Sequence, residues 1–161
     1  MKDGDDINIR SFEDAVADNK RKIKLLLIDT ITKNCASSHH EILQKINHVI
    51  HDCGDGSKLE AIVLSEGHTN FSCKVSVDKH PELCFFAKFC FEWNPDRTVH
   101  YDLQLVENEY KIMQEMSSNI PGSTVLPLAC WDVKHGGQNM KLLVTNWSHV
   151  RSNFAISLST V

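Results

Sequence analysis

The stretch that most constrains the fold of this chain is residues 83–93, "LCFFAKFCFEW", which is rich in aromatic and other strand-forming residues. Lys88 is the single charged residue between Phe85 and Phe91. One interpretation is an edge strand, in which a lysine discourages pairing with other chains. The other is a lysine that faces a specific partner. Strand alternation predicts that Leu83, Phe85, Ala87, Phe89 and Phe91 share one face, and that Cys84, Phe86, Lys88 and Cys90 share the other.

The pattern around this strand predicts an α+β fold. A helical pattern runs from residue 11 to 34, and "SHHE" (residues 38–41) has the form of a capping box that opens a second helix. Strands are expected at 59–65, 71–77 and 83–93, with "DKHPE" as a turn in which Pro81 prevents continuation. A helix at 99–117 and two strands at 124–131 and 140–147, joined by the turn "KHGG", complete the series.

Since the connections are short, we expect a five-stranded, mostly antiparallel sheet with one helix between strands 3 and 4, preceded by two helices. The expected organisation is a disordered start (1–10), a two-helix extension (11–56), a sheet domain (57–147) and a tail without a clear pattern (148–161). With 161 residues, the chain is long enough for one domain with a real core.

Charge and cysteine usage exclude several classes of protein. The net charge of −4 leaves no electrostatic basis for nucleic-acid binding, and no apolar run has the length of a bilayer span. The acidic start "MKDGDDINIR" lacks the apolar core of a signal peptide, so we expect a cytoplasmic protein. Six scattered cysteines without a CxxC pair fit reduced thiols better than a disulfide framework.

The helix expected at 99–117 supplies a partner for Lys88. At 100° per residue, Glu109 falls inside the apolar arc, whereas Glu107 falls at its polar margin. A carboxylate on a buried face is costly unless it is paired, so we predict an ion pair between Lys88 and Glu109. The apolar arc consists of a main stripe (Val99, Leu103, Val106, Tyr110 and Met113) and a lateral extension (Leu105, Ile112 and Met116).

A strand lysine paired with a helix glutamate holds the phosphates of ATP in protein-kinase-like folds. The loop between the first two strands, "SEGHTN" (residues 65–70), would then cover those phosphates. Gly67 would let the backbone approach the phosphate oxygens, and Thr69 and Asn70 could hold the loop by hydrogen bonds. The alternative is a plain hairpin turn.

At these residues the chain resembles the N-terminal lobe of choline and ethanolamine kinases, within the wider aminoglycoside-phosphotransferase-like group. The resemblance covers about residues 59–147 and rests on "EGHTNFSCKVSV", "FFAKF" and "ENEYKIMQEM". It implies ATP as the cofactor and an adenine-side hinge near 144–147, with Thr145 and Trp147. Glu66 replaces the first of the two loop glycines usual in that family, and Thr145 differs from its typical hinge residue. The residues expected to bind the nucleotide are Gly67, Thr69, Asn70, Lys88, Glu109, Thr145 and Trp147.

The resemblance also implies what the chain would need for catalysis. In the family an H-x-D-x-x-x-x-N segment and an acidic Mg²⁺-binding segment lie in a large C-terminal lobe. The sequence offers only His100 and Asp102, with Glu107 at the Asn position, so we read this as coincidence. We therefore expect a chain that cannot transfer phosphate alone, to an amino alcohol or another hydroxyl compound, and whose exposed face needs a C-terminal lobe or another protein as partner.

One further interpretation remains open. The chain could be a non-catalytic interaction module in which Lys88 and Glu109 are only structural. His48, His51 and Cys53 could suggest a zinc site, but a tetrahedral site needs a fourth ligand and no second pair is evident. "GDGSK" (residues 54–58) lacks the spacing of a phosphate-binding loop, and we interpret it as a linker.

Overall fold

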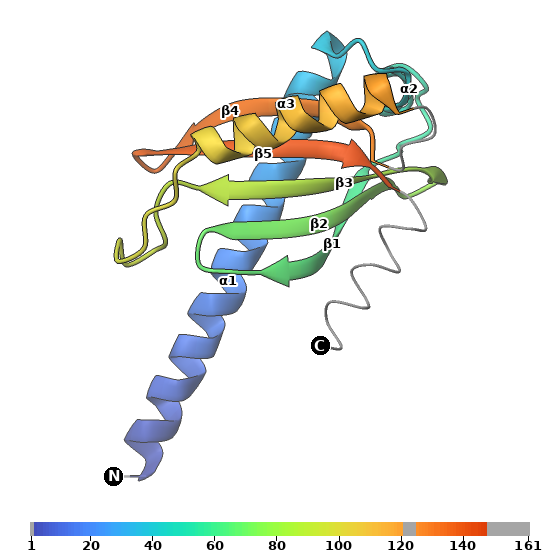
Figure 1. Ribbon diagram of the computed structural model, residues 1–161. Helices are drawn as coiled ribbons and strands as arrows, with labels where there is room; N and C mark the ends of the chain where they lie inside the picture. Colours follow the sequence, from blue (N-terminus) through green and yellow to red (C-terminus); the bar gives the residue numbers. More distant parts are fainter. Residues whose placement is uncertain (1, 121–124, 148–161) are drawn as a thin grey trace.

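The computed structural model describes residues 2–120 and 125–147 and confirms the expected fold class (Figure 1). Three α-helices accompany one five-stranded antiparallel sheet. The expected tail at 148–161 lies outside the described residues. In chain order the elements are α1 (Lys2–Asn34), a 3₁₀ turn (Cys35–Ser37), α2 (Glu41–His51), β1 (Leu59–Glu66), β2 (Asn70–Val77), β3 (His80–Phe91), α3 (Gln104–Asn119), β4 (Pro127–His135) and β5 (Gln138–Asn146).

The strand order is β1-β2-β3-β5-β4, and each neighbouring pair is antiparallel. The aromatic strand β3 therefore lies in the centre of the sheet, between β2 and β5, so the edge-strand interpretation of Lys88 is wrong. The predicted alternation along β3 is confirmed, because Phe85, Ala87 and Phe89 belong to one apolar cluster and Cys90 belongs to another on the opposite face.

One face of the sheet, here called the α1 face, packs against α1 and α2. Both helices contribute fully buried side chains to the same cluster as the sheet, so residues 11–56 share one core with the strands. Burying a leucine or isoleucine side chain in this way contributes about 1.5–3 kcal/mol. The fully buried members of this cluster include Leu27, Ile31, Leu43, Ile46, Val75, Phe85, Phe89, Leu142 and Val144.

The opposite face, here called the α3 face, is covered in part by α3, which lies in front of the sheet in Figure 1 while α1 crosses behind it. A smaller cluster forms between α3 and the strands β3 and β5, centred on Val106, Cys90 and Leu143. Leu103, Tyr110 and Met113 pack around it, which confirms most of the predicted main stripe. Glycines 136 and 137 form the β4–β5 turn with positive φ, the backbone form that two-residue hairpin loops favour.

The starts of two helices, α1 and α3, differ from the expectation. Helix α1 begins at Lys2 rather than at residue 11. Helix α3 begins at Gln104 rather than at residue 99, because the Asp102 side chain accepts a hydrogen bond from the Gln104 backbone at 3.0 Å. Val99 and His100 therefore lie in the preceding loop, where residue 100 bridges to residue 93.

The predicted capping box is wrong, since α2 starts at Glu41 with His40 at the N-cap and no side-chain cap. The Ser38 hydroxyl instead accepts a hydrogen bond from the His40 backbone at 3.2 Å. The expected interruption at Pro81 is also wrong, because β3 already begins at His80. Proline is tolerated there because the position is at the strand start, next to a shift in register between residues 76 and 77.

Candidate functional site

Lys88 and Glu109 form the ion pair that the sequence predicts. The Lys88 Nζ lies 3.0 Å from the Glu109 Oε2, so the ammonium donates a hydrogen bond as well as balancing the charge. The lysine comes from the central strand and the glutamate from the second turn of α3. Their side chains are 23% and 39% exposed, which leaves the couple accessible from the α3 face.

The burial argument that selected Glu109 over Glu107 is wrong in its premise, because the two side chains are almost equally exposed, at 39% and 40%. The difference between them is direction. Glu107 lies near Lys111 and Lys141, at 3.8 and 3.7 Å, and Glu109 lies against Lys88 at hydrogen-bond distance. Glu109 is thus the partner of Lys88.

The β1–β2 loop turns beside this couple, as strand register shows. Ser72 pairs directly with Lys88, and Asn70 pairs with Cys90, so Asn70 starts β2 on the α3 face. Two residues along a strand span about 6.6 Å, which places the loop close to the ammonium group. The loop is a tight one, closed by a hydrogen bond from the Gly67 backbone to the Asn70 carbonyl at 3.0 Å.

Gly67 packs closely against the Asn70 side chain. A Cβ added there would lie 2.8 Å from the Asn70 Oδ1, so the Asn70 side chain folds against the glycine backbone. Thr69 is buried, and its carbonyl accepts a hydrogen bond from the Phe91 backbone at 2.8 Å, which ties the loop to the end of β3. The loop therefore has a residue without a side chain, Gly67, and is held in place against the end of β3.

Glu66, at the end of β1, points away from this region. It pairs in register with Phe71, whose side chain is buried on the α1 face. The Glu66 carboxylate lies 2.6 Å from the Lys20 Nζ of α1. The added negative charge is therefore neutralised on the far face of the sheet.

The two residues expected at the hinge behave differently. Thr145 is fully buried inside β5, opposite Phe86, so it presents no surface to a ligand. Trp147 follows the end of β5 and is half-buried, and its ring lies 4.6 Å from the Lys74 Nζ. This places an indole on the α3 face, across β3 and level with Lys74 on β2.

Sequence reasoning missed a second basic group on this face, Lys141 of β5. Its Nζ lies 2.6 Å from the Asp132 Oδ1, and its side chain is only 14% exposed. The hydrogen bond to Asp132 raises the pKa of Lys141 above its ordinary value. Asp132 and Glu107 both lie near the Lys141 ammonium, whereas Lys88 pairs with Glu109. The positive charge of Lys141 is therefore more fully neutralised than that of Lys88 and attracts an anion less strongly.

No protein-family model and no curated protein matched the chain.

The thiols near the couple are not suited to nucleophilic chemistry. All six cysteines are free, and Cys90 lies two residues from Lys88 on the same face. Burial raises the pKa of Cys90 to about 11, and burial also raises the pKa of Cys130. Since the thiolate is the reactive form, both side chains act as small apolar groups in the α3 cluster.

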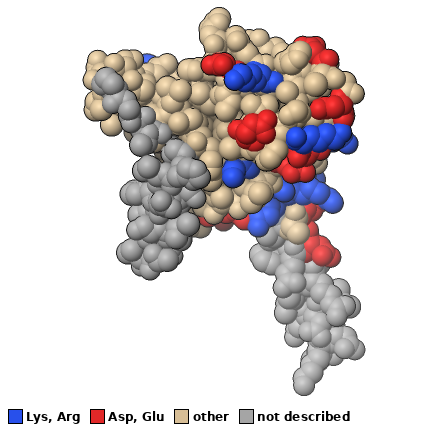
Figure 2. Space-filling view, turned by 90° about the vertical axis from the view of Figure 1, so that its right-hand side faces the viewer, with Lys and Arg blue, Asp and Glu red and all other residues tan. Residues whose placement is uncertain are grey.

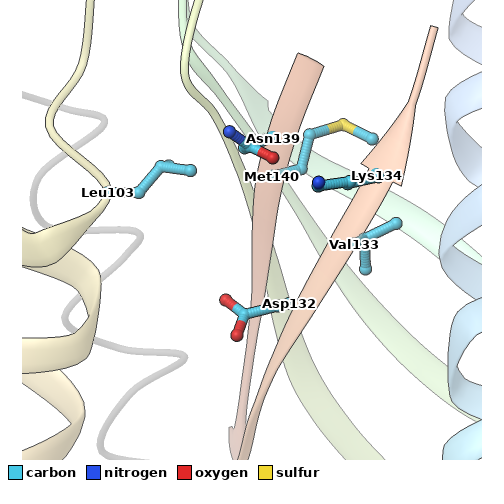
Figure 3. Close-up of a pocket in the computed structure, with 6 residues that line it drawn as sticks. All are labelled: Leu103, Asp132, Val133, Lys134, Asn139 and Met140. Atoms are coloured by element: carbon cyan, nitrogen blue, oxygen red, sulfur yellow. The ribbon is translucent and has the colours of Figure 1, made fainter. Parts of the chain in front are cut away.

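Two hollows lie at the N-terminal end of α3. One, of about 430 Å³, is bordered by Leu103 and by the β4–β5 hairpin, including Asp132 and Asn139 (Figure 3). The other, of about 400 Å³, includes His100, Asp102 and Lys141. Their charged groups are largely paired with one another, as for Lys141 with Asp132, and this leaves no organised set of groups for a ligand. Within residues 2–120 and 125–147, there is no group of three or more His, Cys, Asp or Glu side chains that could hold a metal ion.

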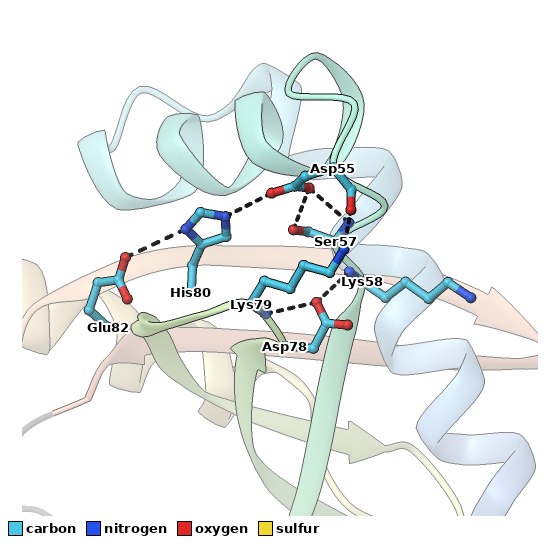
Figure 4. A network of polar contacts seen from close by, with 7 residues as sticks. All are labelled: Asp55, Ser57, Lys58, Asp78, Lys79, His80 and Glu82. Atoms are coloured by element: carbon cyan, nitrogen blue, oxygen red, sulfur yellow. Dashed lines mark hydrogen bonds and ion pairs between the residues drawn. The ribbon is translucent and has the colours of Figure 1, made fainter.

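The expected linker at 54–58 is more structured than its sequence indicates. Asp55 accepts hydrogen bonds from the Ser57 hydroxyl at 2.5 Å and from the Ser57 backbone at 2.9 Å, and it lies 3.0 Å from the His80 Nε2 (Figure 4). The Lys79 ammonium donates to the Asp55 carbonyl. These contacts tie the α2–β1 connection to the β2–β3 turn, so the network is structural and lies apart from the Lys88–Glu109 couple.

The distribution of charged side chains on the surface agrees with the small net charge of −4 that the sequence gives. On the face shown in Figure 2, acidic and basic side chains are interspersed, and no broad region carries only one sign. No helix in the described part of the chain is long and apolar enough to cross a membrane.

Proposed function

We propose that this chain forms the nucleotide-binding lobe of a small-molecule kinase that resembles choline and ethanolamine kinases. ATP would bind on the α3 face, with its phosphates at Lys88 beneath the 66–70 loop. The observation that carries the proposal is the 3.0 Å contact between Lys88 on the central strand and Glu109 on the helix between strands 3 and 4. In protein kinases, a lysine and a glutamate in these positions must be paired for phosphoryl transfer.

Three further features support this assignment. The loop beside Lys88 contains Gly67, which has no side chain, so its backbone can approach a phosphate closely. Trp147 supplies an aromatic ring at the end of β5, where the base of a nucleotide would lie. Thr145 is buried, and we therefore assign base contact to Trp147 and the neighbouring backbone rather than to the Thr145 side chain.

The test is direct titration of ATP, with and without Mg²⁺, into the wild-type chain and two lysine variants. Lys88→Ala should weaken binding about tenfold or more, since a hydrogen bond to a charged group contributes about 1.5–3 kcal/mol. Lys134→Ala, which removes an exposed lysine of β4, is the matched control and should leave the affinity unchanged. Absence of saturable binding, or equal affinity in the Lys88→Ala variant, would contradict the proposal.

A second candidate function, a protein-interaction module, is favoured by one observation. Leu105, Ile112 and Met116 on α3 are 52%, 57% and 48% exposed and lie two turns and then one turn apart, on the side of the helix that carries Glu109. An apolar stripe of this kind is typical of a surface that another protein covers. ATP titration separates the two functions, because an interaction module needs no nucleotide site.

A further inference from the structure

A bulge in β1 determines which face of the sheet Glu66 occupies. Before the bulge, the odd-numbered residues of β1 face α1, and Val63 accordingly lies opposite Cys73, a buried member of the α1-face cluster. The register shifts between residues 63 and 65, so Leu64 is an extra residue in β1. A β-bulge changes the face to which the following side chains point. Glu66 is therefore on the α1 face, although strict alternation would place it on the α3 face with the even-numbered residues of β1.

Without the extra residue, a carboxylate would lie in the row of side chains that contains Lys88. Ser65 occupies that place instead, because it pairs with Ser72, and Ser72 pairs with Lys88. Residues directly opposite one another in a sheet point to the same face, and two strand spacings, about 9.6 Å, separate β1 from β3. The bulge thus keeps the acid at residue 66 away from the phosphates that the proposed function places at Lys88.

On the other face, Glu66 meets helix α1, which crosses behind the sheet in Figure 1. The Lys20 Nζ lies 2.6 Å from the Glu66 Oε1, and both side chains are 44% exposed. Lys24, one turn further along α1, lies near the same place. Burial raises the pKa of the Cys73 thiol to about 11, and to a lesser extent Lys24 lowers this pKa and Glu66 raises it, so both charges are close to the thiol. The end of β1 therefore lies among cations of α1.

This contact matters because the loop at 66–70 begins at Glu66. Backbone hydrogen bonds hold the rest of the loop: the Gly67 amide donates to the Asn70 carbonyl at 3.0 Å, and the Phe91 amide donates to the Thr69 carbonyl at 2.8 Å. A short surface loop of this kind opens at a low free-energy cost. A single ion pair at its first residue can therefore change the population of the open loop measurably.

We propose that Lys20 and Glu66 are positioning residues for the β1–β2 loop, through which α1 holds the loop in place from the α1 face. The part of this proposal that concerns ATP rests on the proposed function, since the held loop would present the Gly67 backbone to phosphates at Lys88. Helix α1 is then part of the nucleotide-binding unit rather than a separate extension.

The anchor is tested by amide hydrogen exchange in the nucleotide-free full chain, measured by NMR. The reporters are the Gly67 and Phe91 amides, which both donate to carbonyls of the loop or its end. In Lys20→Met and in Glu66→Gln they should exchange about two- to fivefold faster than in wild type, the range that corresponds to exposed ion pairs. Lys20→Arg keeps the charge and should keep the wild-type exchange rates.

Three controls separate an electrostatic anchor from a general loss of stability. Lys33→Met removes another ion pair of α1, with Asp29 at 2.9 Å, and should leave both reporter amides unchanged. The Asp78 amide, which donates to the Lys58 carbonyl at the other end of the β1–β2 hairpin, should exchange at the wild-type rate in every variant. Raising the ionic strength from about 0.01 M to about 1 M should remove most of the difference between wild type and Lys20→Met, because salt screens exposed charges.

Equal exchange in wild type and Lys20→Met, or an acceleration that salt does not reduce, would overturn the anchor. Titration of the same variants with ATP tests its consequence: the affinity should fall about two- to fivefold in Lys20→Met and should be kept in Lys20→Arg. Equal affinity in wild type and Lys20→Met would overturn the role of the anchor in nucleotide binding. The exchange rates do not depend on nucleotide, so faster exchange in Lys20→Met, with no ATP binding by any variant, would support the anchor and refute the proposed nucleotide site.

Discussion

The Lys88–Glu109 couple gives the sharpest prediction for stability. At 3.0 Å, Coulomb's law gives an attraction of about 1.4 kcal/mol in water and about 5.5 kcal/mol at an effective dielectric constant of about 20. Desolvation of the mostly buried Lys88 and ordering of two long side chains offset much of the larger value. We therefore expect a net coupling of about 1 kcal/mol, at the upper end of the values measured for exposed pairs.

The assay is a double-mutant cycle built from Lys88→Met, Glu109→Gln and the double variant, measured by urea unfolding. Methionine keeps the apolar stem of the lysine, and glutamine keeps the shape of the glutamate, so the cycle isolates the charge interaction. With a urea slope of about 1–3 kcal/mol/M, a 1 kcal/mol loss lowers the unfolding midpoint by about 0.3–1 M. Glu107→Gln is the matched control and should cost less than Glu109→Gln, because its lysine partners lie at 3.7 and 3.8 Å.

A coupling below about 0.3 kcal/mol, within the range of pairs that contribute nothing measurable, would refute the reasoning. Equal losses from Glu107→Gln and Glu109→Gln would refute it as well, since the geometry would then not distinguish the two acids. In the first case the couple would be a contact that contributes no measurable stability, and its role as a fixed phosphate-binding unit would lose its physical basis.

Three other perturbations have clear expected outcomes. Leu27→Ala should lower the free energy of unfolding by about 2–5 kcal/mol, whereas Leu25→Ala on the exposed side of α1 should change it by less than about 0.5 kcal/mol, as thermal or urea unfolding will show. Gly67→Ala should cost about 1 kcal/mol through contact with the Asn70 side chain, and the loss should shrink when it is measured in an Asn70→Ala background. Hydrogen bonds from the Ser57 hydroxyl, and then from His80, hold the pKa of Asp55 below its ordinary value. The stability that the ionised Asp55 contributes is therefore present above the unfolded pKa of about 3.9, and it is lost as the pH falls toward the lower folded pKa. Unfolding midpoints measured on acidification below about pH 4 should consequently fall less in Asp55→Asn than in wild type.

The sequence predicted those parts of the fold that depend on local periodicity. The alternation in residues 83–91 determined the two faces of β3, and the 3.6-residue pattern identified the side of α3 that packs on the sheet. Helix ends were predicted less well, because they depend on single hydrogen bonds such as the one from the Gln104 backbone to Asp102. The network at Asp55 was missed because its partners, the β2–β3 turn residues, are about 25 positions away in sequence.

The identity of the glutamate at Lys88 shows why a correct partner can follow from an incorrect premise. Residues two apart on a helix point about 200° apart, so Glu107 and Glu109 face different strands whatever their burial. Glu109 meets Lys88 on β3, and Glu107 approaches Lys141 on β5. Two adjacent strands therefore each offer a lysine to α3, and the rotation of the helix decides which acid reaches which lysine. That rotation is set by the buried contacts of Val106 and its neighbours, so the apolar stripe, rather than the burial of either carboxylate, places Glu109 beside the central strand.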